Sequence, residues 1–466
     1  IFLESLPDDP ALCRDPEIRR RNADRLRFYE GYGARPILGT DYEKPWAEGL
    51  DLDNWPYLVF DGLGRAIEPA LTEIQAIVRT ILEHKYGPQC STGYIERVAR
   101  SFRDDPVRLR PLRRWLAGPE PPGRIERTLS GRVPLVVNDK HEIHHVRDRG
   151  YVEAPVRISS ILKELDGAAP FERIAPRAFS EDHIRAVHDG DFVTFLKAAC
   201  ALVPSEKSIY PYVFPIRNYK RRPKSVPLRA GYYCIDTFTP LNANAWLAAR
   251  RAVDCALTAA EYVLEGARLA YALVRPPGHH AERRAFGGFC YLNNAAIAAN
   301  YLSRYGRVAV LDIDYHHGNG TQEIFWRRSD VLTVSIHGHP SFAFPYFSGF
   351  RDEEGEGPGK GFNLNIPLPE ETTPDAFRKA LSAALQRLRS FSAGFTVLSM
   401  GFDTAAGDPT GSWHNRPQDF RRIGEAVGAL ETPILVIQEG GYRTRSLGAN
   451  ARHFFEGLWM GKRPAS

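Results

Sequence analysis

Residues 308–320 read Val-Ala-Val-Leu-Asp-Ile-Asp-Tyr-His-His-Gly-Asn-Gly. The four apolar residues that open this stretch are typical of a strand buried on both faces. Carboxylates and imidazoles follow directly, at the point where such a strand ends. Ligands of open parallel sheets bind at the carboxyl ends of the strands. The stretch therefore predicts a buried parallel strand that carries a functional site at its end.

Similar apolar runs recur along the chain and alternate with helical patterns. The other runs cover residues 133–137, 272–275, 331–336, 396–400 and 434–438. The helical patterns cover residues 243–269, 292–305, 374–391 and 417–430. Buried strands that alternate with helices indicate an α/β fold of three layers, in which helices cover both faces of a parallel sheet.

The N-terminal part of the chain has a different pattern. Residues 1–64 combine three strand-like runs with one helical pattern, which predicts a small α+β unit. Residues 65–130 contain helical patterns that end at a Pro-rich break at 118–122, so we expect a helical linker region there. The α/β domain is then expected to cover residues 131–466.

Composition excludes several classes of protein. The chain has 466 residues, of which 43% are hydrophobic and 25% charged, as in ordinary globular proteins. Its net charge of +5 is small for this length and does not indicate nucleic-acid binding. No apolar run reaches the ~20 residues that span a bilayer, and no signal segment is evident, so we expect a cytoplasmic protein without a membrane anchor. The six cysteines form no C-x-x-C pair, which favours reduced thiols.

Side chains with metal-binding chemistry follow two of the predicted strands. Asp314 and His316 are two residues apart, so their side chains share one face of an extended segment. Asp403 follows another apolar run and would arrive from a second strand end. Two carboxylates and one imidazole suit Zn²⁺ or Fe²⁺ and leave positions open for water and substrate. Such an ion activates water and polarises a carbonyl oxygen, which predicts a hydrolase.

Groups suited to proton transfer lie on two further strand ends. His279 and His280 close an Arg-Pro-Pro-Gly-His-His loop, and neutral imidazoles can accept a proton from water and pass one to a leaving amine. Asp312 and Asn319 flank the expected metal ligands and are predicted to fix the tautomers of these histidines. Tyr442 follows a flexible Gly-Gly pair and can bring its hydroxyl to a tetrahedral oxyanion.

The residues from about 133 to 460 resemble the histone deacetylase and acetylpolyamine amidohydrolase family, which has the arginase-deacetylase fold. The family's motifs occur in its order at residues 275–280, 287–294, 312–320, 403–409 and 439–442. The resemblance implies a parallel, mainly eight-stranded sheet. It also implies a zinc-dependent deacetylase that hydrolyses an acetyl amide.

The resemblance implies a role for each site residue. Zn²⁺ would be bound by Asp314, His316 and Asp403. A potassium ion would lie near Asp312 and would be held in part by Ser335.

The catalytic groups implied by the resemblance surround this metal. His279 and His280 would form the general acid/base pair, and Tyr442 would stabilise the oxyanion. Asn319 stands where some members have Asp, which leaves the division of acid and base between the two histidines open. The channel for the acetylated aminoalkyl chain would be lined by Gly288, Phe289 and Phe347.

Two features bear on the substrate. Residues 231–240 and 337–347 look like the acetylpolyamine branch of the family. Residues 217–224 are strongly basic, which would disfavour a cationic polyamine if this loop lay at the channel mouth. A solvated surface loop is the simpler interpretation.

Three functions follow from these patterns. The leading one is hydrolysis of small acetylated amines, foremost acetylpolyamines; the second is the same reaction on acetyl-lysine in proteins. The third is a non-catalytic regulatory or binding module, against which the intact set from His279 to Tyr442 argues. The sequence leaves the oligomeric state open: polyamine-type relatives are often dimers, and loops at 205–230 or 340–360 could form the contacts of a homodimer.

The N-terminal unit has a resemblance of its own. Asn22 and the following residues 28–35 resemble the last helix and strand of GNAT-type acetyltransferases. The family's coenzyme A-contacting Asn and Tyr would correspond to Asn22 and Tyr29. The family's pyrophosphate loop, Q/R-x-x-G-x-G/A, is missing here and would lie upstream of Ile1. We therefore expect residues 1–64 to be a structural remnant that does not bind coenzyme A by itself.

Two short patterns mimic other sites. Residues 141–145 match H-E-x-x-H, the zinc-protease pattern, which needs a helix to bring its histidines together. A strand-like run precedes them, so we expect no protease site. Residues 355–361 are rich in Gly but lack the G-K-[ST] ending of a phosphate loop, and we expect a surface loop.

Overall fold

A computed structural model describes residues 2–10, 12–30, 34–46, 53–61, 69–110, 131–218 and 220–462. The chain divides into two compact units, Ile1–Glu120 and Pro121–Ser466. The Pro-rich break expected at 118–122 lies outside the described residues.

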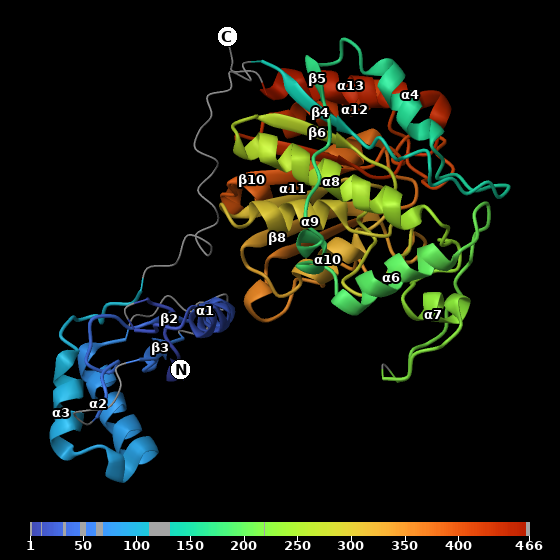
Figure 1. Cartoon of the computed structure of the whole chain (residues 1–466). Helices are drawn as coiled ribbons and strands as arrows, with labels where there is room; N and C mark the ends of the chain where they lie inside the picture. Colours follow the sequence, from blue (N-terminus) through green and yellow to red (C-terminus); the bar gives the residue numbers. More distant parts are fainter. Residues whose placement is uncertain are drawn as a thin grey trace. The chain divides into compact units, whose positions relative to one another are not determined.

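The larger unit is built on one sheet of eight parallel strands (Figure 1). In sheet order the strands are β5 (Phe171–Ile174), β4 (Val133–Val137), β6 (Leu269–Leu273), β11 (Ile434–Gln438), β10 (Phe395–Met400), β7 (Val308–Asp312), β8 (Val331–Gly338) and β9 (Asn363–Leu368). The sheet confirms the predicted parallel α/β fold and its eight strands.

Both faces of the sheet are covered because successive side chains of each strand point in opposite directions. In β7, Val308 and Val310 belong to one buried cluster, whereas Ala309 and Leu311 belong to the other. The first cluster is completed by α6 (Gly190–Leu202), α8 (Ala245–Leu264) and α9 (Asn294–Leu302). The second is completed by α4 (Val156–Glu164), α11 (Pro374–Phe391), α12 (Pro417–Gly428) and α13 (Thr444–Lys462).

Some predicted boundaries differ from the structure. α8 ends at Leu264 and β6 begins at Leu269, because Gly266 adopts a φ of +105° that turns the chain between them. The edge strands β5 and β9 were not predicted. They read Phe-Glu-Arg-Ile and Asn-Leu-Asn-Ile-Pro-Leu, and the polar residues and proline hide the strand pattern.

The smaller unit contains an antiparallel sheet in the order β1 (Phe2–Ser5), β3 (Tyr57–Phe60), β2 (Arg35–Pro36). The α-helices among its described residues are α1 (Pro16–Glu30), α2 (Leu71–Ile81) and α3 (Thr92–Ser101). Ile74 and Val78 of α2 share one buried cluster with Leu58 and Phe60 of β3. The helices predicted as a linker region therefore pack with the N-terminal strands into one unit.

Asn22 of the smaller unit is buried, and its side chain is hydrogen-bonded to other residues of that unit. Its Nδ2 donates to Pro7 O and to Asn54 Oδ1, both at 2.8 Å. Residues 31–33, which belong to the acetyltransferase-like stretch, lie outside the described residues. The acetyltransferase resemblance stays a prediction.

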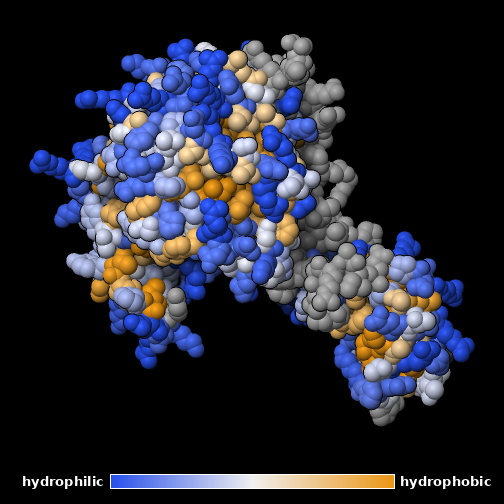
Figure 2. All heavy atoms as spheres, turned by 180° about the vertical axis from the view of Figure 1, so that it is seen from behind, coloured by the Kyte–Doolittle hydropathy of each residue, from blue (hydrophilic) through white to orange (hydrophobic). Residues whose placement is uncertain are grey.

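Hydrophilic residues cover most of the surface in the view of Figure 2, and apolar residues gather in smaller patches between them. The described helices include none with the length and apolar character needed to cross a bilayer. The described cations of the basic loop, among them Arg217, Lys220 and Lys224, are exposed, and Arg222 pairs with Asp191 at 2.5 Å.

Candidate active site

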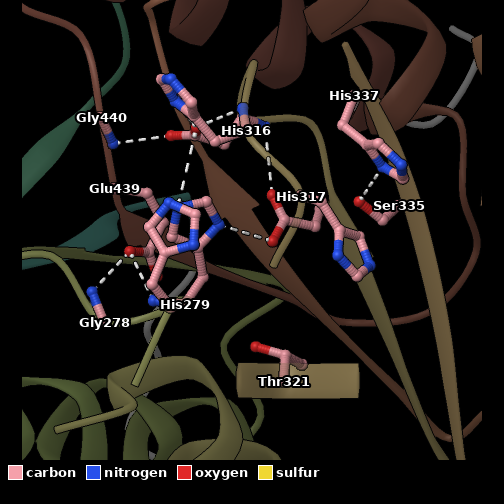
Figure 3. Close-up of polar contacts among 12 residues, drawn as sticks. Gly278, His279, His316, His317, Thr321, Ser335, His337, Glu439 and Gly440 are labelled. Atoms are coloured by element: carbon pink, nitrogen blue, oxygen red, sulfur yellow. Dashed lines mark hydrogen bonds and ion pairs between the residues drawn. The ribbon is translucent and has the colours of Figure 1, made fainter. Parts of the chain in front are cut away.

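The candidate site lies where four neighbouring strands end. β6, β11, β10 and β7 are adjacent in the middle of the sheet and all run in the same direction, so the segments that follow them meet at one edge. These segments carry His279, Glu439, Asp403 and Asp314, respectively. Figure 3 shows one of the contacts between them, in which Glu439 Oε2 accepts a hydrogen bond from Gly278 N at 2.6 Å.

Asp314, His316 and Asp403 converge, as their spacing predicted. One ligand atom from each lies within 4.8 Å of the other two. His316 Nδ1 is 3.3 Å from Asp314 Oδ1 and 3.1 Å from Asp403 Oδ2. Backbone donors hold the carboxylates in place: Tyr315 N donates to Asp403 Oδ1 at 2.9 Å, and Gly440 N donates to Asp314 Oδ2 at 2.8 Å.

The electrostatics of this cluster favour a cation. Burial and the negative charge of Asp314 raise the pKa of Asp403 to about 7. Although burial opposes it, the two carboxylates raise the pKa of His316 to about 9. Without a cation, protonation of Asp403 would relieve the repulsion, whereas a positive charge between the two carboxylates stabilises both in their charged form.

Glycine residues make room for the two carboxylates. A Cβ at Gly401 would lie 2.1 Å from Asp314 Oδ2, and a Cβ at Gly440 would lie 2.4 Å from Asp403 Oδ2. Both distances are shorter than any van der Waals contact, so only glycine fits.

Gly401→Ala is expected to weaken metal binding by roughly 10- to 100-fold, the usual effect of disturbing the surroundings of a ligand. The added methyl group must displace Asp314, because it would also lie 2.7 Å from the Asp314 Cα. Isothermal titration of metal-free protein with zinc measures the change. Gly306→Ala is the matched control, since its Cβ would meet only Phe395 at 3.6 Å. Equal zinc affinity in both variants would contradict the expectation.

The paired histidines differ in their partners. His279 Nδ1 is 2.9 Å from Asp312 Oδ2, and His280 Nδ1 is 2.7 Å from Asn319 Oδ1. The structure thus places both predicted partners beside their histidines.

The two histidines also differ in charge. Burial lowers the pKa of His279, but the charges of Asp312 and Asp314 outweigh it and raise this pKa to about 10. Burial, followed by the charges of His279 and His316, lowers the pKa of His280 well below its usual value. His280 is therefore the neutral imidazole of the pair and His279 the more basic one.

Tyr442 is held at the site by its backbone and by its ring. Its N–H donates to Asp408 Oδ2 at 2.7 Å, and the guanidinium of Arg157 lies 4.7 Å from the ring centroid. Arg157 Nε also donates to Gly441 O at 2.7 Å, which fixes the glycine pair before the tyrosine. Burial raises the pKa of Tyr442 well above its usual value, so its hydroxyl remains a hydrogen-bond donor.

Aromatic rings lead from the surface to the histidines. Phe289 is 5.6 Å from Tyr442 and 5.6 Å from Phe238, and Phe344 is 4.9 Å from the His280 ring, all between centroids. Gly288 lets the backbone before Phe289 pass close to the His280 ring, since a Cβ at Gly288 would lie 2.2 Å from His280 Cδ2. Phe347, which was predicted to line the channel, is 55% exposed. Phe344, which was not among the predicted channel residues, packs on His280.

Two other groups of polar residues are less suited to a metal. His279, Cys290 and Glu439 also offer ligand atoms within 4.8 Å of one another. The Glu439 carboxylate, however, already accepts from the backbone N–H groups of Gly278 and His279. The H-E-x-x-H segment at 141–145 forms a turn at 141–143 and irregular chain at 144–145, so it lacks the helix that the zinc-protease pattern needs.

The eight-stranded parallel sheet covered by helices on both faces, with the cluster Asp314, His316 and Asp403 and the paired histidines at its strand ends, has the arginase-deacetylase fold. A family model described as histone deacetylase domain matches residues 151–458. The chain therefore belongs to the histone deacetylase family.

Individual relatives agree with this assignment. Acetylpolyamine amidohydrolase 2 of Pseudomonas aeruginosa is 38% identical over 336 residues, covering 69% of this chain and 98% of the relative. Acetylpolyamine amidohydrolase of Burkholderia pseudomallei is 42% identical over 326 residues, covering 68% of this chain and 96% of the relative. The crystal structure of acetylpolyamine aminohydrolase from Burkholderia pseudomallei superposes with a TM-score of 0.66 and 40% identity, covering 70% of this chain and 98% of that one.

Proposed function

We propose that this protein is a zinc-dependent deacetylase that hydrolyses the acetyl amide of small acetylated amines, foremost acetylpolyamines. The observation that carries the proposal is the convergence of Asp314, His316 and Asp403 beside the pair His279–His280. The similarity to acetylpolyamine amidohydrolases over almost their whole length supports the substrate class.

The cluster fits zinc by its chemistry. Zinc takes imidazole nitrogen and carboxylate oxygen, and a site with three protein ligands keeps a position open for water or substrate. Asp314, His316 and Asp403 would hold the ion. When bound, it would polarise the acetyl carbonyl and lower the pKa of a water molecule to roughly 7. A potassium ion near Asp312 and Ser335 stays a prediction.

The side chains around the cluster would move the protons. His280 Nδ1 faces the amide oxygen of Asn319, so this nitrogen carries a proton and Nε2 is free to accept one from the attacking water. His279, which the charge of Asp312 keeps basic, would deliver a proton to the leaving amine nitrogen. The Tyr442 hydroxyl would donate to the carbonyl oxygen as it becomes an oxyanion. We assign the base to His280 and the acid to His279 on this difference in partners.

Tyr442→Phe is expected to lower kcat by about 10²- to 10³-fold, the usual effect of removing one oxyanion donor. KM should change little, because the hydrogen bond strengthens only as charge develops on the oxygen. Steady-state kinetics measure the changes in kcat and KM separately. Tyr305→Phe, a tyrosine that packs against Tyr301 away from the site, serves as the control. A Tyr442→Phe enzyme with unaltered kcat would exclude this role.

The substrate assignment is tested by acetate release. Zinc-loaded protein is given N-acetylputrescine, N-acetylspermidine and an acetyl-lysine peptide in parallel. A much higher kcat/KM on the two polyamines is the expected result. Preference for the peptide would instead indicate that the protein acts on acetyl-lysine in proteins. The exposed basic loop at 217–224 would then be the first region to mutate.

A further inference from the structure

A carboxylate that the proposed reaction does not use lies behind Asn319. Glu282 Oε1 accepts a hydrogen bond from Asn319 Nδ2 at 2.8 Å, and Asn319 Oδ1 lies 2.7 Å from His280 Nδ1. Glu282 follows His280 by two residues, whereas Asn319 begins α10 (Asn319–Phe325). The side chain of Asn319 therefore bridges a carboxylate and the imidazole assigned as the base.

We propose that Glu282 is a positioning residue that orients the Asn319 amide and thereby holds His280 in the tautomer protonated on Nδ1. This inference rests on the proposed function, in which His280 Nε2 accepts the proton of the attacking water.

The two ends of an amide differ in their hydrogen bonding. Its nitrogen only donates hydrogen bonds and its oxygen only accepts them. A carboxylate at Glu282 accepts only from the amide nitrogen, so the oxygen of Asn319 must face His280. With the amide turned over, Asn319 would present its NH₂ group to His280 Nδ1. The proton of a neutral His280 would then lie on Nε2, and that nitrogen could not act as the base.

The backbone around Glu282 is fixed from several sides. Glu282 N donates to Ala285 O at 2.8 Å, and Glu282 O lies 2.8 Å from Nδ1 of His188. Gly320 lets the start of α10 approach closely, since a Cβ there would lie 2.2 Å from Ala281 O. The Glu282–Asn319 contact is thus held by two rigid segments, as an orienting contact requires.

Glu282 also influences the charge of its surroundings. Burial and the charge of Glu323 raise the pKa of Glu282 to about 7, although the hydrogen bond from Asn319 opposes this. The charged form of Glu282, which can only accept from Asn319, therefore predominates above about pH 7, and the variants are compared there. His188 behind it has a pKa lowered by burial to about 4 and is neutral. A negative Glu282 stabilises an imidazolium at His280 through the amide, so its removal should lower the pKa of His280.

Three variants test the proposal. Glu282→Ala removes both the charge and the acceptor and should lower kcat by roughly 10- to 100-fold, as loss of an orienting partner usually does. KM should be unchanged, because Glu282 does not touch the substrate. Glu282→Gln keeps an acceptor oxygen, so kcat should fall less, and the acid limb of the kcat/KM profile should move to lower pH. Glu356→Gln is the matched control, because Glu356 is an exposed carboxylate that pairs with Arg327 at 2.7 Å, and it should leave both kcat and the profile unaltered.

A second readout does not depend on turnover. In protein labelled with ¹⁵N-histidine, the His280 signals are assigned by their loss in His280→Ala. The wild-type protein should show a single form protonated on Nδ1, and Glu282→Ala should show a second form. An unchanged His280 tautomer in Glu282→Ala would overturn the proposal, as would equal effects of Glu282→Gln and Glu356→Gln. If the wild-type protein released no acetate, the proposed function would fail while the tautomer measurement still decided the role of Glu282.

Discussion

Replacing Asp403 with Asn is expected to abolish zinc binding and to lower the rate of acetate release by about 10³-fold or more. A catalytic metal supplies several kcal/mol of transition-state stabilisation, and each tenfold in rate corresponds to ~1.4 kcal/mol. The substitution keeps the shape of the side chain and an acceptor for the N–H of Tyr315, which donates to Asp403 Oδ1 at 2.9 Å. It removes only the charge that complements the ion.

Metal analysis of the purified variant measures the first effect, and acetate release the second. Asp330→Asn is the control, because Asp330 is paired with Arg328 outside the site. Thermal unfolding without added metal should show that Asp403→Asn folds, since the change relieves repulsion between Asp403 and Asp314. Full zinc content in Asp403→Asn would contradict the assignment of this ligand.

His280→Ala is expected to have the second large effect, a fall in kcat of about 10²- to 10⁴-fold, which is the contribution of a positioned general base. His280 is the neutral histidine of the pair because burial and the nearby charges of His279 and His316 lower its pKa. The substitution removes the imidazole that faces Asn319 Oδ1 at 2.7 Å.

The kinetic pattern identifies the role of His280. Zinc content should stay near one equivalent, because His280 is not among the ligands, and KM should change less than kcat. His453→Ala on α13 is the control, since the His453 ring bonds only the helix backbone at Ala449. If His280→Ala retained wild-type kcat, the acid/base assignment would be wrong.

The central strands could be predicted from the sequence because they are buried on both faces. Every residue of the Val-Ala-Val-Leu run in β7 is buried and apolar. Such a strand can be recognised without knowing which face of the sheet each side chain covers. Edge strands such as β5 mix polar and apolar residues, so they have no comparable signal. The helices α2 and α3 were predicted, but their packing against β3 depends on contacts distant in the sequence.

The convergence of Asp314, His316 and Asp403 beside the two histidines was predictable for a related reason. Asp314 and His316 lie two residues apart directly after a recognisable strand, and Asp403 follows another, so strand order alone brings them together. Phe344 and Glu282 gave no such signal. Phe344 reaches His280 from a loop beyond β8, and Glu282 reaches Asn319 across the start of α10. Contacts of this kind follow from loop conformation, which periodicity does not encode.

Whether the protein is a zinc-dependent deacetylase is decided by titrating metal-free protein with zinc and measuring acetate release from N-acetylputrescine at each step. We expect no turnover in the metal-free protein and a rate that rises until about one equivalent of zinc is bound, as for a single site of three protein ligands. Asp403→Asn should stay inactive throughout the titration. Acetate release that persists after the metal has been removed, or that zinc does not restore, would exclude zinc-dependent hydrolysis at this site.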